Sequence, residues 1–264
     1  RADGGSHKVE LTVGDKVVSW LWVVDRAWRV GSARVRMGGI GGVGTDPEHR
    51  HRGYSSACMA RAVEFMREAG YRMSALFGIP DFYHRWGYAT VMPEPRLNLA
   101  TKEALRAERV RGHRVVPFSR ERHAREALAI YAEANRGRSG SAIRPGGLPG
   151  EWDQPPTVPG PAWKRWNPFR IGSNWGIRTD SFAVVDRRGR LLGYAAHDRP
   201  RDAFVVVEVG VRGPEAYPTI TAELAARARR ALFENIRMLL PFDDPYSTWL
   251  QRWTFTHSLQ FWRH

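Results

Sequence analysis

The sequence contains a single cysteine, no long apolar run, and far fewer acidic than basic residues. One cysteine in 264 residues cannot form a disulfide within the chain, which is typical of a reducing compartment. No apolar stretch approaches the roughly 20 residues that a membrane-spanning helix needs. We therefore predict a cytoplasmic protein without a membrane span, in which Cys58 is a packed core thiol.

The charge balance is strongly basic, with 41 lysines and arginines against 27 acidic residues and a net charge of +14. Such a surplus raises nucleic acid as a partner, because phosphate groups attract basic surfaces. The arginines, however, are spread from Arg26 to Arg263, and no lysine-rich tail or known nucleic-acid motif is present. The sequence thus favours a solvated basic surface and disfavours nucleic-acid binding.

Hydrophobic periodicity predicts an α/β (α+β) chain in which strands and helices follow one order twice. The first set comprises strands at 7–13, 16–24, 28–35 and 38–45, a helix at 54–68 and a strand at 71–77. The second set comprises a strand at 110–118, a helix at 121–135, a hairpin at 182–185 and 191–196, a strand at 203–211 and a helix at 219–235. Between the helix and the hairpin of the second set lies a long irregular stretch, 136–180, with Trp152, Trp163, Trp166 and Trp175.

The segment that joins the strand ending at Thr45 to the helix starting at Tyr54 has the composition of an anion site. It combines a small, glycine-rich strand, the basic run Arg50-His51-Arg52, and a glycine directly before the helix. Free backbone N–H groups at a helix N-terminus bind anions, and glycine allows the ligand to approach closely. The residues predicted to contact the anion are Val43, Gly44, Thr45, Arg50, His51, Arg52, Gly53, Tyr54, Ser55 and Ser56. The alternative is an exposed basic turn that merely precedes a helix.

Two nearby motifs carry a family resemblance. The run DPEHRHRGYSSACM is followed by FYHRWGYA, and together they resemble the GNAT superfamily of acyl-CoA-dependent N-acetyltransferases, with the closest likeness to the Eis-type (enhanced intracellular survival) branch. The likeness covers residues 37–92. The superfamily usually has Gly or Ala at the position of Ser55, and Eis-type proteins often have a Ser-Glu pair at the position of Gly78-Ile79.

The resemblance implies tandem GNAT-like domains, each a mixed, mostly antiparallel sheet flanked by helices. Residues 1–100 would form the catalytic domain, whose first elements are expected to be missing. Residues 101–264 would form a second, degenerate domain without a coenzyme A loop, since Pro214 and Pro218 remove N–H donors where the loop would lie. Eis-type proteins also carry a third domain, so we expect this sequence to be part of a longer chain.

The resemblance further implies transfer of acetyl from acetyl-CoA, the co-substrate, to a primary amine by direct attack. Gly78 and Ile79 would contact the cofactor, and Tyr83 would protonate the departing thiolate. The alternative for Tyr83 is a core aromatic. Aminoglycosides are the acceptors that the Eis-type likeness suggests, although the sequence has no acidic cluster to bind a polycation. The acceptor is expected to be a small molecule, and assembly into a homo-oligomer stays open.

The general base is not identified by the sequence. Asp46, Glu48 and His49 border the loop and suit turn and surface roles, and His84 lies next to Tyr83. In Eis-type enzymes the C-terminal carboxylate of the third domain is thought to take the amine proton. No His-x-x-x-His spacing or paired cysteine indicates a metal. The rival functions are a non-catalytic GNAT-fold module that binds acyl-CoA or nucleic acid, and a transferase of longer acyl or aminoacyl groups.

Overall fold

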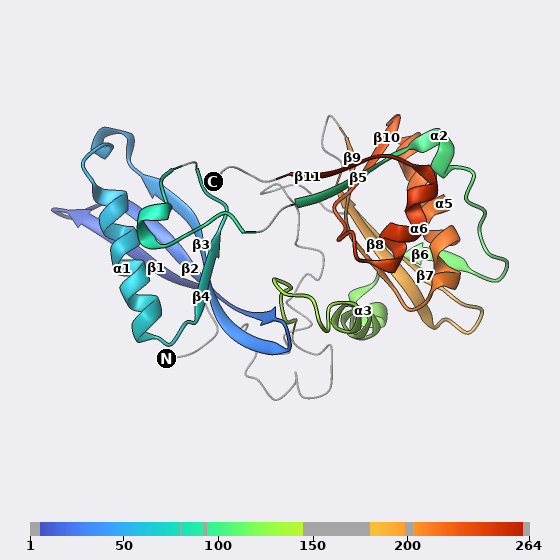
Figure 1. The fold of residues 1–264 in the computed structure, drawn as a ribbon, viewed down its shortest axis with the longest axis horizontal. Helices are drawn as coiled ribbons and strands as arrows, with labels where there is room; N and C mark the ends of the chain where they lie inside the picture. Colours follow the sequence, from blue (N-terminus) through green and yellow to red (C-terminus); the bar gives the residue numbers. More distant parts are fainter. Residues whose placement is uncertain (1–5, 80, 92–93, 145–179, 199–202, 261–264) are drawn as a thin grey trace.

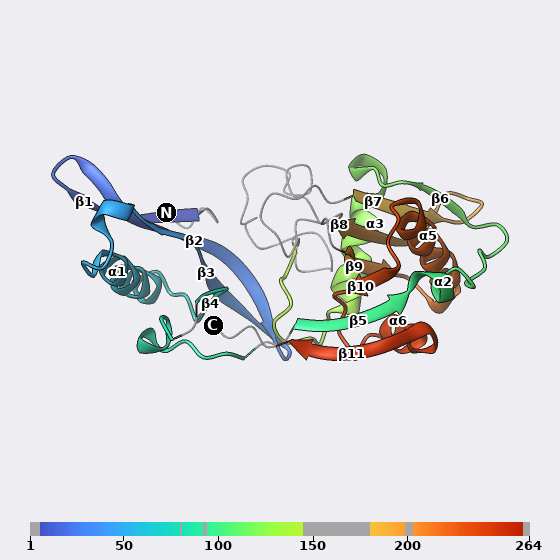
Figure 2. The ribbon, with the colours of Figure 1, turned by 90° about the horizontal axis from the view of Figure 1, so that it is seen from above.

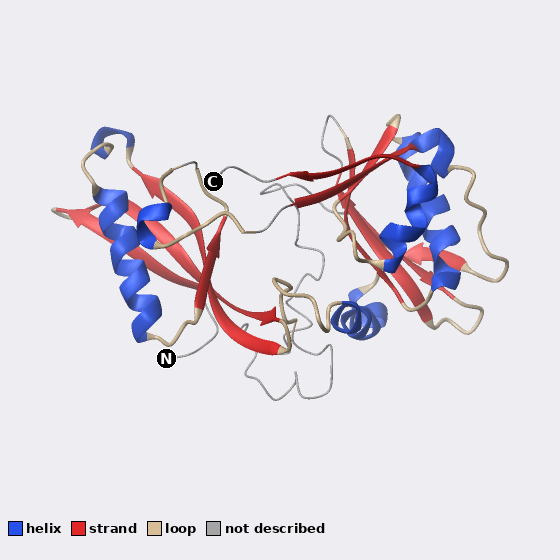
Figure 3. Ribbon diagram, in the orientation of Figure 1, coloured by secondary structure: helices blue, strands red, loops and turns tan. Residues whose placement is uncertain are grey.

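The computed structural model describes residues 6–79, 81–91, 94–144, 180–198 and 203–260. Two sheets lie side by side along the long axis of the molecule, a four-stranded and a seven-stranded one (Figure 1). Figure 3 shows that each sheet is flanked by helices. The predicted mixed α/β fold class is confirmed. The four tryptophans of the stretch 136–180 lie outside the described residues.

The first sheet has the order β1-β2-β3-β4. Its elements are β1 (Ser6–Val13), β2 (Lys16–Val30), β3 (Ala33–Thr45) and β4 (Met73–Leu76), with helix α1 (Tyr54–Glu68) and the 3₁₀ turns η1 (Pro47–His49) and η2 (His84–Trp86). Only β3 and β4 are parallel, and α1 is the crossover that joins them. Helix α1 buries Cys58, Met59, Ala62 and Met66, whose three- and four-residue spacing forms one apolar stripe.

The second sheet has the order β11-β5-β10-β9-β8-β7-β6. Its strands are β5 (Glu94–Ala100), β6 (Arg114–Pro117), β7 (Asp180–Val185), β8 (Leu191–Asp198), β9 (Phe204–Val211), β10 (Asn235–Met238) and β11 (Thr254–Gln260). Its helical elements are α2 (Thr101–Ala104), α3 (Arg120–Ala134), η3 (Pro214–Ala216), α5 (Tyr217–Arg230), α6 (Pro245–Leu250) and η4 (Gln251–Trp253).

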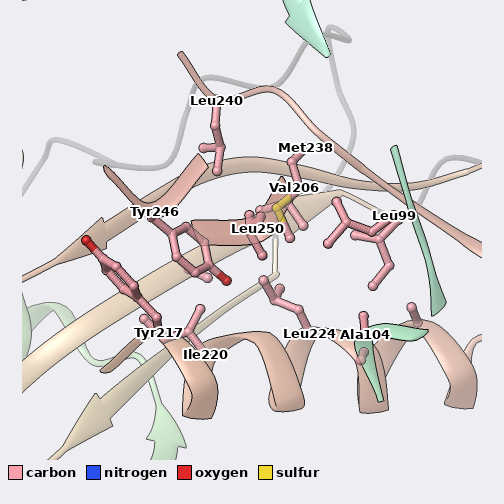
Figure 4. Close-up of a cluster of buried hydrophobic side chains, with 14 of the residues drawn as sticks. Leu99, Ala104, Val206, Tyr217, Ile220, Leu224, Met238, Leu240, Tyr246 and Leu250 are labelled. Atoms are coloured by element: carbon pink, nitrogen blue, oxygen red, sulfur yellow. The ribbon is translucent and has the colours of Figure 1, made fainter. Parts of the chain in front are cut away.

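Helices cover the second sheet on both faces, and each face has its own core. Helix α3 contributes Ala127 and Ile130 to one core. On the other face α5 and α6 bury a larger cluster against β5, β9 and β10, including Ile220, Leu224 and Tyr246 (Figure 4). Strands buried on both sides become continuous apolar runs, as in Phe204–Val211.

Several elements differ from the sequence prediction. The helix expected at 219–235 ends at Arg230, and Asn235–Met238 is a strand parallel to β9. Helix α6 and strand β11 were not predicted. A domain boundary was expected between residues 100 and 101, yet β5, which precedes it, pairs with β10 and β11. The reason is burial, because Leu97 and Leu99 are fully enclosed in the second sheet's core.

The tip of the β2–β3 hairpin joins the two parts of the molecule, and Figure 2 shows the hairpin reaching beyond the rest of the first sheet. Backbone hydrogen bonds connect Arg29 N to Ser141 O at 2.9 Å and Ile143 N to Ala27 O at 2.7 Å. The Arg29 guanidinium is buried and donates to Ala142 O at 3.2 Å. The segment 141–143, which follows α3, therefore pairs with β2 near the tip of the β2–β3 hairpin. None of the described helices is both long and apolar enough to span a membrane.

Candidate active site at the end of strand β3

Strands β3 and β4 separate before β3 ends. Their parallel pairing runs from Met37 opposite Met73 to Ile40 opposite Leu76, whereas β3 continues to Thr45. Beyond Ile40, no strand among the described residues pairs with this edge of β3. The last part of β3, which includes Val43, Gly44 and Thr45, thus presents backbone N–H and C=O groups to a gap between two strands.

A β-bulge shapes this strand end. Trp20 of β2 lies opposite Gly44, and Trp22 lies opposite Gly41, so β3 has one residue more than β2 in this interval. Gly42 has a φ of 60°, a conformation that glycine adopts without strain. A Cβ on residue 44 would lie 2.6 Å from the Trp20 ring, so the ring lies directly on the Gly44 backbone. The glycine-rich run signals the close approach, but the bulge was not predicted.

The loop after β3 is held by polar contacts at its base and is open at its basic tip. Asp46 accepts a hydrogen bond from Glu48 N and forms an ion pair with Lys16 at 2.7 Å. The Lys16 ammonium holds the pKa of Asp46 below its usual range. Arg50 Nε lies 3.5 Å from Thr45 O. Beyond it, the side chains of Arg50, His51 and Arg52 are exposed.

The start of helix α1 offers unpaired donors directly after this loop. Gly53 is the N-cap with a φ of 80°, and no side chain caps the helix. The first helical bond runs from Ala57 N to Gly53 O at 3.0 Å. The N–H groups of residues 53–56 therefore find no acceptor among the described residues. Together with the three exposed basic side chains, they make a cationic, donor-rich surface of the kind that suits a phosphate or pyrophosphate group.

Tyr83 lies in an aromatic cluster that packs under the strand end. It is 8% exposed and shares a core with Ile40 and Met59. Its ring centroid lies 4.9 Å from that of Phe82 and 6.4 Å from that of Trp86. Burial raises the pKa of the Tyr83 hydroxyl above its ordinary 10.0, so the group stays protonated at neutral pH. No described residue hydrogen-bonds to this hydroxyl, which leaves it available as a donor.

The segment after β4 approaches Tyr83 from the other side. A Cβ on Gly78 would lie 2.3 Å from the Tyr83 ring, so only glycine fits between the backbone and the ring. Ile79, which the sequence places among the cofactor contacts, is 61% exposed. Tyr88 differs from Tyr83, because its hydroxyl lies 2.6 Å from Ser74 Oγ inside the cluster. His84 is exposed in η2.

Asp46, Glu48 and His49 are the one group of metal-ligand types that converges among the described residues. One ligand atom from each lies within 4.8 Å of the others. The Asp46 carboxylate is already bonded to Lys16, and Glu48 is exposed. An ion would have to displace the ammonium, so the arrangement does not favour a metal, and the expected absence of one stays a prediction.

A family comparison agrees with this geometry. Residues 7–91 match the model of the acetyltransferase (GNAT) domain. That match contains β1 to η2 and every predicted site residue of the loop, and it supports acyltransferase chemistry in general. No curated protein matches the chain in sequence.

Solved structures resemble the whole chain rather than the first sheet alone. A probable N-acyltransferase from Enterococcus faecalis aligns with a TM-score of 0.68 at 18% identity, over 88% of this chain and 54% of its own. A GCN5-related N-acetyltransferase from Kribbella flavida aligns with a TM-score of 0.68 at 19% identity, over 95% of this chain and 57% of its own. Eis1 from Mycobacterium abscessus aligns with a TM-score of 0.58 at 17% identity, over 96% of this chain and 61% of its own.

At identities of 17–19% the likeness to these structures shows the fold, but it does not show that the chain belongs to the Eis-type branch. The sequence spans little more than half the length of these three proteins, between 54% and 61%. The GNAT likeness is therefore confirmed for the domain, whereas the Eis-type assignment stays a prediction.

Proposed function

We propose that this chain contains the catalytic domain of an acetyl-CoA-dependent N-acetyltransferase that acts on a primary amine. One observation carries the proposal: an open strand edge, a basic loop and an uncapped helix N-terminus follow one another within β3 and α1. The pyrophosphate of coenzyme A fits the N–H groups of residues 53–56, and the pantetheine arm fits the edge of β3 beyond Ile40. The basic side chains Arg50 and Arg52 add charge complementarity.

In the proposed reaction the amine nitrogen attacks the acetyl carbonyl, the new C–N bond forms, and the C–S bond breaks. Backbone N–H groups at the end of β3 would stabilise the charge that develops on the carbonyl oxygen. Tyr83 would then donate its proton to the departing thiolate. The raised pKa supports this role, because it keeps the hydroxyl protonated at neutral pH.

The group that removes the amine proton is not among the carboxylates of the loop. Asp46 is held by Lys16, and Glu48 lies on the outer side of η1, where it is exposed. The part of β3 that faces the gap, Gly41–Thr45, contains no acidic residue. We propose that deprotonation falls to His84, to water, or to a group outside residues 1–264.

A binding module without turnover is the second candidate, and the lack of a base at the strand end favours it. In that case acetyl-CoA would bind equally well, but no amine would be acetylated. Release of free coenzyme A in the presence of a panel of primary amines separates the two candidates. Polyamines and aminoglycosides belong in the panel, as do amines that also carry a carboxylate.

Calorimetric titration of acetyl-CoA into the Gly53→Asp variant tests the binding site. The change places a carboxylate and a side chain at the helix N-terminus, so we expect the affinity to fall by at least tenfold, about 1.4 kcal/mol. Gly70→Asp is the matched control. Gly70 also has a positive φ, of 76°, and open space around it, but it lies at the other end of α1.

The two variants introduce the same charge and the same backbone strain, so their comparison isolates position. Gly70→Asp should bind acetyl-CoA as the unchanged protein does. If a folded Gly53→Asp variant also binds normally, the cofactor site lies elsewhere.

A further inference from the structure

A second concavity of the first domain lies at the opposite end of β4 from the strand gap. It has a volume of about 440 Å³, within the range of roughly 300–1,000 Å³ that small-molecule sites occupy. Helix α1 forms one wall, the start of β4 forms the floor, and the segment after η2 forms the other wall. Its lining includes Met66, Arg67, Arg72, Ser74, Trp86 and Tyr88. Neither the loop 50–53 nor Tyr83 lines it.

Apolar side chains line one part of this cavity, and polar groups line the rest. Val63 and Met66 approach from α1, Met73 from β4, and Trp86 from η2. The hydroxyl groups at the floor already have hydrogen-bond partners. Tyr88 Oη lies 2.6 Å from Ser74 Oγ, and the Ser74 hydroxyl donates to Gly38 O at 2.7 Å. A ligand here would therefore bury an apolar body against methionine and aromatic side chains.

The charged groups at the rim are both cationic. Arg67 and Arg72 are exposed, and neither side chain forms an ion pair with a described residue. Two other arginines of this domain are paired, Arg36 with Asp25 at 2.7 Å and Arg61 with Glu64 at 3.3 Å. No acidic residue lines the cavity. Two guanidinium groups beside an apolar hollow match a carboxylate on a hydrophobic body.

We propose that this cavity binds a small organic carboxylate with an aromatic or medium-chain aliphatic body. The site is distinct from the proposed acetyl-CoA site and does not depend on acetyl transfer. Its wall does contact the same aromatic cluster, because the ring centroid of Tyr88 lies 6.1 Å from that of Tyr83. A ligand in the cavity would therefore lie one side chain away from the proposed catalytic acid.

Titration with matched probes tests the charge preference. Indole-3-propionate and octanoate carry the carboxylate, and tryptamine and octylamine carry an ammonium on a similar body. We expect the two acids to bind at least tenfold more tightly than the two amines. Equal binding of acids and amines, or no binding of either acid, would overturn the proposal.

Variants test the location. The double variant Arg67→Gln, Arg72→Gln should lower the affinity for both acids about tenfold, while Arg61→Gln, a charge loss elsewhere on α1, should leave it unchanged. Ala89→Trp, at an exposed lining position, should fill the cavity and remove binding. An equal loss in Arg61→Gln would show a general charge effect and contradict the site.

The proposal can fail separately from the proposed function. Acetyl-CoA should bind the double arginine variant normally, and Gly53→Asp should still bind the acids. Loss of acid binding in Gly53→Asp would place both ligands in one site and refute a separate cavity.

Discussion

Helices α1 and α5 stand at equivalent places in the two sheets, yet only α1 starts after a glycine in the left-handed region and an exposed basic loop. Each follows a long strand and a 3₁₀ turn, β3 and η1 in the first case, β9 and η3 in the second. In each sheet the strand after the helix returns parallel to the strand before it. In both, the parallel pairing stops early, at Ile40 of β3 and at Val206 of β9.

The difference lies in what occupies the gap beyond that point. In the first sheet the edge of β3 stays open among the described residues, and glycine precedes α1. In the second sheet the apolar side chains of Leu240, Tyr246 and Leu250 pack with Val206 in one core (Figure 4). The same order of strand, turn, helix and strand thus leaves an open strand edge in the first sheet and forms packed core in the second.

The backbone before each helix reinforces this contrast. Gly53 adopts a φ of 80°, whereas Ala216 before α5 has a φ of −83°. Pro214 and Pro218 lack N–H groups that an anion would need. The arrangement of strands and helices alone therefore does not predict a cofactor site. The prediction depends on whether the backbone at the start of the helix offers free N–H donors.

The largest expected effect is on the free energy of unfolding, through a buried ion pair of the second sheet. Arg144 and Glu208 are both buried and form two hydrogen bonds, at 2.7 and 2.9 Å, while Tyr194 also donates to Glu208 at 2.7 Å. Arg144→Met leaves a buried carboxylate without its cation, so the free energy of unfolding should fall by about 3–5 kcal/mol. Urea denaturation measures it. Arg136→Met, which removes a pair with the exposed Glu133, should cost less than about 1 kcal/mol.

The next effect is on turnover. Tyr83→Phe removes a proton donor that is needed only as the thiolate leaves, so kcat should fall about 100-fold or more while acetyl-CoA affinity stays nearly unchanged. Steady-state kinetics with calorimetry separates the two quantities. Tyr88→Phe, which removes a hydroxyl bonded to Ser74, is the control and should keep most of its kcat. A Tyr83→Phe variant with full kcat would reduce Tyr83 to a packing role.

The stoichiometry of binding tests the contrast directly. We expect the protein to saturate with one equivalent of acetyl-CoA, because the start of α5 lacks the donors that α1 presents. Isothermal titration gives the number of sites. Saturation at two equivalents would mean that the second sheet also binds the cofactor, and that the packed gap opens.

The smallest effect is expected for the acidic residues of the loop. Asp46→Asn and Glu48→Gln should each keep the dependence of kcat/KM on pH. The pKa of Asp46 lies below its ordinary 3.8 because Lys16 donates to its carboxylate. The carboxylate is therefore already ionised at neutral pH and contributes no titration to the activity profile there. Loss of the basic limb in either variant would identify the base and overturn its proposed location.

The sequence by itself determined the local part of the site. The helix at 54–68, the glycine before it and the basic run could be predicted because they depend on neighbours a few residues apart: periodicity, φ preference and charge. The hairpins at 7–24 and 182–196 followed from the same local signals. The family motifs added Tyr83, whose position beside Ile40 no local pattern could supply.

Only the tertiary structure decided what depends on distant partners. Strand β10 was not predicted. The predicted helix ran to residue 235, where this strand begins, because a short apolar run suits either state until β9 and β5 pair with it. Strand β5 joined the second sheet because Leu97 and Leu99 find their core there. The open edge of β3 and the filled gap beside β9 depend on which side chains arrive from elsewhere in the chain, and that is settled by packing rather than by the strands themselves.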